Sequence, residues 1–122
     1  MQSGELSPAE FERVAGEALD SLPQRFADLV ENVVIAVEEE PSADDLRAVD
    51  LGGNTELLGL YRGVARTERG VAAPLLPDQI ALFRGPINRV SRTREDAVHR
   101  VRDTVIHELG HYFGLDDEAM RP

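Results

Sequence analysis

The sequence predicts an α+β domain in which helices pack on one small sheet. Three observations support this: a capped amphipathic helix near the N-terminus, short apolar runs in the middle of the chain, and a long helical pattern near its end. With 122 residues, of which 42% are hydrophobic, the chain can bury roughly 65% of the surface that it exposes when unfolded. We therefore expect a single domain over residues 1–122.

The first helix is marked at its start by a capping box. Ser7 is a suitable N-cap, Pro8 suits the first helical position, and Glu10 stands where it can close the box. Pro23 is expected to end this helix and to open a short second one around Phe26. One buried stripe is predicted by the helical spacing of the apolar residues Phe11, Val14, Ala15, Ala18, Leu19 and Leu22.

Three apolar runs predict strands. Residues 33–37 are rich in β-branched side chains and predict a strand with much of its surface buried. Residues 56–61 and 79–83 predict two more strands, and residues 64–74 between them predict a hairpin-type connection. The three glutamates and the proline at 38–41 indicate a surface loop.

The longest helix is predicted over about residues 94–113. Thr93 can cap it, and Glu95 and Asp96 in its first turn interact favourably with the helix dipole. The predicted architecture is therefore a small sheet packed on helices, with a long C-terminal helix.

Composition excludes several classes of function. There are no cysteines, which excludes disulfides, thiolate metal sites and a cysteine nucleophile. The 23 acidic residues outnumber the 13 basic ones, and a net charge of −10 argues against nucleic acid or an anionic membrane as a partner. The N-terminus lacks a signal-peptide pattern, and the longest apolar run is too short to span a membrane. We expect a cytoplasmic monomer.

A metal-site motif lies in the last helix. The segment T-V-I-H-E-L-G-H-Y-F-G-L-D-D contains H-E-x-x-H as His107, Glu108 and His111, and Gly114 and Asp117 extend it to H-E-x-x-H-x-x-G-x-x-D. With this composition the short motif would arise by chance about 0.008 times per chain, so it is a strong signal.

The spacing places both histidines on one side of the helix. His107 and His111 are four residues apart, so both imidazoles can bind the same Zn²⁺. At about 100° per residue, they lie opposite the arc of apolar side chains. Glu108 lies between the two faces, where this motif uses it to accept a proton from a water that zinc activates. The apolar arc comprises Val98, Val101, Val105, Ile106, Leu109, Tyr112 and Phe113.

Gly114 is expected to end the helix in the left-handed conformation and to turn the chain back. That turn brings Asp117 towards the metal as third ligand, although Asp116 or Glu118 could replace it. Three protein ligands and a water are typical of catalytic zinc sites, whereas structural sites have four protein ligands.

The chain resembles the zincin metallopeptidases, in the subgroup whose third zinc ligand is aspartate. Besides the motif, the segments L-G-L-Y-R-G-V at 58–64 and I-A-L-F-R-G-P-I at 80–87 resemble the small bacterial mini-zincins. The resemblance implies a zincin-like fold with a mixed sheet above an active-site helix. It also implies one zinc ion bound by His107, His111 and Asp117, with Glu108 as general base.

The resemblance is incomplete. Metzincins have a third histidine and a later methionine turn, whereas here Met120 follows Asp117 too closely for that turn. Only five residues follow Asp117, so we expect a cleft that is one-sided, shallow or completed by a partner.

Two functions are consistent with these features. The first is a zinc metallopeptidase acting on a peptide or protein substrate that lies along an edge strand, for which we expect residues 79–83. The second is a non-catalytic zinc-binding or interaction module on the same scaffold.

Four further side chains are weaker candidates. Asp103 could orient His107 or be a solvated surface carboxylate, and His99 lies off the metal face. Tyr61 and Tyr112 could donate a hydrogen bond to an oxyanion, although we expect Tyr112 to pack in the core.

Overall fold

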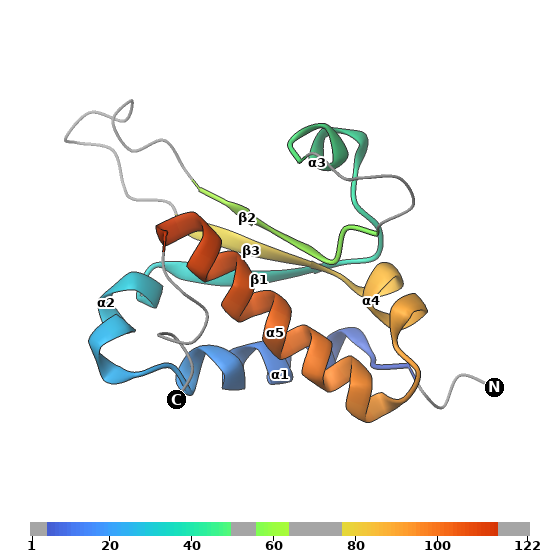
Figure 1. The fold of residues 1–122 in the computed structure, drawn as a ribbon, viewed down its shortest axis with the longest axis horizontal. Coiled ribbons are helices and arrows are strands. Elements are labelled where there is room, and N and C mark those ends of the chain that lie inside the picture. The colour runs from blue at the N-terminus through green and yellow to red at the C-terminus, as the bar shows by residue number, and fades with distance from the viewer. Residues whose placement is uncertain (1–4, 50–55, 64–76, 115–122) are drawn as a thin grey trace.

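The computed structural model describes residues 5–49, 56–63 and 77–114. These form an α+β fold with a three-stranded mixed sheet in the order β1-β3-β2 (Figure 1). Strand β1 (Val33–Glu38) runs parallel to β3 (Asp78–Phe83). Strand β2 (Gly59–Arg62) runs antiparallel to β3. The predicted fold class is thus confirmed, while the predicted connection at 64–74 lies outside the described residues.

The two long helices pack against each other and against one face of the sheet (Figure 1). Helix α1 (Pro8–Asp20) has the predicted capping box between Ser7 and Glu10. Helix α5 (Arg94–Phe113) has the predicted bounds. After α1 the chain forms the short helices η1 (Gln24–Phe26) and α2 (Ala27–Val30).

Two short helices were not predicted. Helix α3 (Ala43–Arg47) follows β1 and begins with a second capping box, formed by Ser42 and Asp45. Helix α4 (Arg84–Val90) follows β3 where we expected only the end of a strand. Its Pro86 is tolerated because the first turn of a helix needs no backbone donor.

The sheet order corrects our expectation for the edge strand. Residues 79–83 were expected to bind a peptide, but they lie in β3, which is hydrogen-bonded on both sides. The edge strands are β1 and β2. Val34 on β1 is 41% exposed because it lies on the face opposite Val33 and Ile35, which pack against the larger core cluster.

The core has two parts on opposite faces of the sheet. The larger cluster joins α1, α5 and the sheet, and includes Phe11, Ile80 and Leu109, which are fully buried. The smaller cluster comprises Leu57, Ala81 and Phe83, with Val49 and Leu60 packed against it. Within the described ranges, no helix is both long enough and apolar enough to cross a membrane.

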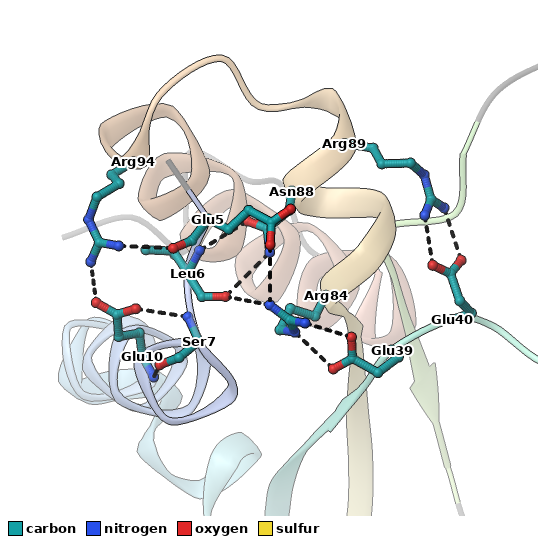
Figure 2. A network of polar contacts seen from close by, with 10 residues as sticks. All are labelled: Glu5, Leu6, Ser7, Glu10, Glu39, Glu40, Arg84, Asn88, Arg89 and Arg94. Carbon is teal, nitrogen blue, oxygen red and sulfur yellow. Dashed lines mark hydrogen bonds and ion pairs between the residues drawn. The ribbon is translucent and has the colours of Figure 1, made fainter. Parts of the chain in front are cut away.

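Much of the acidic run after β1 is bound to helix α4. Arg84 donates to Glu39 at 2.8 Å, and Arg89 forms two hydrogen bonds with Glu40 (Figure 2). The Arg84 side chain also donates to the Leu6 carbonyl at 3.0 Å, which ties the N-terminal segment to the same corner. The expected surface loop is therefore a point of attachment for α4.

Candidate active site

Helix α5 presents His107 and His111 together, on the side opposite its buried residues. Both side chains are exposed, and their rings are nearly parallel at 13° with centroids 6.2 Å apart. The helix is fixed at both ends: the Thr93 side chain accepts a hydrogen bond from the backbone N–H of Asp96, and Gly114 ends it at φ 70°. The predicted arrangement of the histidines and the helix end is therefore present.

Glu108 is half-buried between the histidines and strand β2. One of its carboxylate oxygens, Oε1, accepts a hydrogen bond from the backbone N–H of Tyr61 at 3.2 Å. Burial raises the pKa of the Glu108 carboxyl, while the Tyr61 N–H and the two histidines lower it in part. The carboxylate is thus held in a fixed direction and is more basic than an exposed glutamate.

A cavity of about 500 Å³ lies beside these three side chains. Helix α5 forms one wall, β2 and the residues just before it form the base, and the residues after α3 form the other wall. Its lining residues are Ala48, Val49, Leu57, Gly59, Leu60, Tyr61, His107, Glu108, His111 and Tyr112. Sequence reasoning missed the wall at Ala48 and Val49, because those residues are about 60 positions away from the motif.

Gly59 allows α5 to lie this close to β2. A Cβ atom at Gly59 would lie 2.5 Å from Cγ2 of Thr104 on α5 and 2.9 Å from the Ala81 carbonyl oxygen on β3. Glycine within an apolar strand is a known signal of close backbone approach. The L-G-L-Y segment therefore contained a usable signal for this contact.

The two tyrosines differ in their environments. Their rings stack with centroids 3.9 Å apart, and the buried Tyr61 hydroxyl donates to Asp78 at 2.7 Å. Tyr112 packs on Tyr61 and Phe113, as expected, but it is 50% exposed and lines the cavity, so it does not lie in the buried core. The stack with Tyr61 holds its ring at the cavity instead.

Comparison with known proteins agrees with this geometry. A family model described as zincin-like metallopeptidase matches residues 30–122. The chain belongs to the zincin-like metallopeptidase family. This zincin-like chain also matches the structure of a conserved hypothetical protein from Thermus thermophilus, with a TM-score of 0.58 and 22% identity over 88% of this chain and 94% of that one. At that identity the likeness shows the fold alone. No curated protein compared with the chain matches it.

The two histidines of this zincin-like site fit a zinc ion. Two imidazoles that share one tetrahedral zinc at Zn–N distances of about 2.0–2.1 Å would have centroids roughly 5 Å apart, which is close to the observed 6.2 Å. Asp117 and the alternatives Asp116 and Glu118 lie outside the described residues. In the described ranges, no three His, Asp or Glu side chains are grouped to hold a metal, so the third ligand stays a prediction.

Asp103 and His99 occupy different positions around the zincin-like site. Asp103 is exposed and lines a neighbouring hollow of about 350 Å³ with His107 and Glu108, so a role in orienting His107 stays a prediction. His99 is exposed in a separate hollow that it shares with Arg94 and Arg102, off the metal face as expected.

Proposed function

We propose that this protein is a zinc-dependent metallopeptidase that hydrolyses peptide bonds, with Glu108 as the general base. The observation that carries this proposal is the position of Glu108. Its carboxylate lies at the cavity beside His107 and His111, and the Tyr61 N–H holds one oxygen. Membership of the zincin-like family supports the same chemistry.

Each group in the site has a defined task under this proposal. His107, His111 and Asp117 would hold the zinc, which when bound acidifies a water and polarises a carbonyl. Glu108 accepts the proton of the attacking water and later passes it to the leaving amine. Because Tyr61 fixes Oε1, the other oxygen, Oε2, is available for that proton.

Among the described residues no strand pairs with the outer edge of β2, and this supports an extended peptide as substrate. The Leu58 carbonyl accepts a hydrogen bond from the Phe83 N–H at 2.9 Å, whereas the Tyr61 N–H points to Glu108. Backbone groups alternate in an antiparallel pair, so Gly59 and Tyr61 direct theirs away from β3. A peptide can add to this edge beside the cavity, a role that we now assign to β2 in place of β3.

Zinc content and cleavage together test the proposal. Wild-type protein should bind one zinc per chain and cleave members of a mixed-sequence peptide library. His111→Ala should lose most of its zinc, whereas the matched control His99→Ala should keep it. Glu108→Gln should keep its zinc and lose at least about 10²-fold in turnover.

Other outcomes would reject parts of the proposal. Equal zinc in wild type and His111→Ala, after adventitious metal has been removed, would reject the metal site. Full zinc occupancy without cleavage of any peptide would reject the peptidase and support a non-catalytic zinc-binding module. Wild-type turnover in Glu108→Gln would reject the assigned base.

A further inference from the structure

We propose that Arg62 is a positioning residue of the cavity, because it holds helix α3 on the outer face of the sheet and so fixes the wall formed by Ala48 and Val49. The position of α3 is independent of the peptidase activity. Only the consequence for substrate binding rests on the proposed function.

The Arg62 guanidinium joins the sheet to α3. From β2, its Nη1 donates to Glu38 at the end of β1 at 2.9 Å and lies 3.4 Å from the Gln79 side chain on β3. Its Nη2 donates to both carboxylate oxygens of Asp45 on α3, at 2.9 and 3.0 Å. The Arg62 side chain on β2 therefore contacts β1, β3 and helix α3.

Helix α3 depends on this contact because its other side chains are not buried. Of its five residues, all within the described part of the chain, Asp45 alone is buried, at 7% exposure. The apolar Leu46 is 45% exposed. The buried anchor of α3 is thus a carboxylate, and a buried carboxylate needs a charged or hydrogen-bonding partner. Arg62 supplies that partner together with the Ser42 N–H, while the Ser42 hydroxyl accepts from the Asp45 backbone N–H.

The residues that directly follow α3 form part of the cavity wall, so the position of α3 sets the position of that wall. Ala48 closes the helix with its N–H donating to the Asp44 and Asp45 carbonyls, and Val49 packs on the small cluster of Leu57, Ala81 and Phe83. Ala48 and Val49 then line the cavity across from α5. A shift of α3 would therefore move the apolar wall, while Glu108 and the histidines would stay in place on α5.

Hydrogen exchange tests the anchoring without any assay of activity. We expect the amides of Leu46 and Ala48, which are bonded to Ser42 and Asp44, to lose about tenfold or more of their protection in Arg62→Met. The matched control is Arg84→Met, which removes a comparable two-pronged pair with Glu39 but does not touch α3. Arg84→Met should leave the α3 amides within about twofold of wild type.

Asp45→Asn provides a second variant in case Arg62→Met does not fold. Asparagine keeps the shape of the side chain and a weaker bond to Ser42, so the same local loss of protection is expected. Unprotected α3 amides in the wild type, or equal loss in Arg62→Met and Arg84→Met, would overturn the proposal. Unchanged exchange in both Arg62→Met and Asp45→Asn would overturn it as well.

Steady-state kinetics separate positioning from a general loss of structure. On a peptide that the wild type cleaves, Arg62→Met should raise KM about three- to tenfold and keep kcat within about twofold, because the wall binds substrate and the proton-transfer groups are unchanged. A fall in kcat with unchanged KM would overturn the link to the cavity. If no peptide is cleaved, the proposed function fails, and hydrogen exchange still decides the role of Arg62.

Discussion

The contact between α5 and β2 at Gly59 gives the sharpest test of the structure. A Cβ atom added by Gly59→Ala would lie 2.5 Å from Thr104 Cγ2 and 2.9 Å from the Ala81 carbonyl oxygen, both well inside ordinary contact distance. Neither atom can move easily. Thr104 is a buried β-branched residue on a helix, and Ala81 belongs to the central strand.

The expected change in stability is the sum of two opposing effects. Overpacking a well-packed site costs about 1–3 kcal/mol, and replacing glycine by alanine returns about 0.4–1 kcal/mol by restricting the unfolded chain. The net loss is about 1–2 kcal/mol. For a domain of this size that corresponds to a Tm lower by roughly 3–10 °C.

Thermal unfolding followed by circular dichroism measures this loss, and Gly16→Ala is the matched control. Gly16 lies within α1, where an added Cβ meets no atom within 4 Å. Alanine is favoured over glycine in a helix by about 1 kcal/mol, so Gly16→Ala should raise Tm by about 3–5 °C. The same substitution is thus expected to act in opposite directions at the two positions.

A second substitution identifies the cause of the Gly59→Ala effect. Thr104→Ser removes Cγ2, so Gly59→Ala should be less destabilising in that background, whereas Thr104→Val keeps the methyl group and should give no relief. A Tm for Gly59→Ala at or above the wild-type value would refute the close approach of α5 to β2. It would also remove the structural reason for the Tyr61–Glu108 hydrogen bond.

Three further predictions concern charge and metal. The pKa of Glu10 is lowered to about 2 by the Ser7 N–H and by Arg94. The stability that ionised Glu10 gives the fold is therefore present above pH 4.5 and is lost as pH falls towards 2. The Tm difference between wild type and Glu10→Gln should shrink from pH 6 to pH 3. Burial raises the pKa of Glu108, which penalises the charged form in the folded state. Glu108→Gln should then raise the Tm of zinc-free protein, and the gain should grow as pH rises through that pKa; a lower Tm at pH 7 would contradict this. Chelation by EDTA at 25 °C should lower Tm but leave the helical circular dichroism in place, because the core of α1, α5 and the sheet does not involve the ligands.

Local sequence signals were sufficient for the two long helices. The start of α1 depends on a capping box between Ser7 and Glu10, and α5 begins after Thr93 and ends at Gly114. These signals act between residues a few positions apart, so they can be read without the fold. The geometry of His107 and His111 follows from the same helix, which is why it could be predicted too.

Features set by contacts between distant residues could not be predicted in the same way. Helices α3 and α4 are short, and ion pairs to β2 and to Glu39, the residue after β1, contribute to their placement. The central position of β3 did have a signal: Ile80, Ala81, Leu82 and Phe83 form an unbroken apolar run, which is typical of a strand buried on both faces. The hydrogen bond from Tyr61 to Glu108 joins residues 47 positions apart, and local spacing carries no information about it.

The order of the strands changes what the proposed function implies for substrate binding. Because β2 forms an edge of the described sheet, the strand that would bind a peptide also contacts Glu108, the proposed general base. The Tyr61 N–H is already donated to Glu108, so an added peptide can pair with the Gly59 N–H and carbonyl and with the Tyr61 carbonyl, but not with that N–H. Gly59 itself must stay a glycine for α5 to approach. The same short strand would therefore set both the position of Glu108 and the alignment of the substrate, and a peptide shifted by one residue along β2 would turn its side chains to the opposite face.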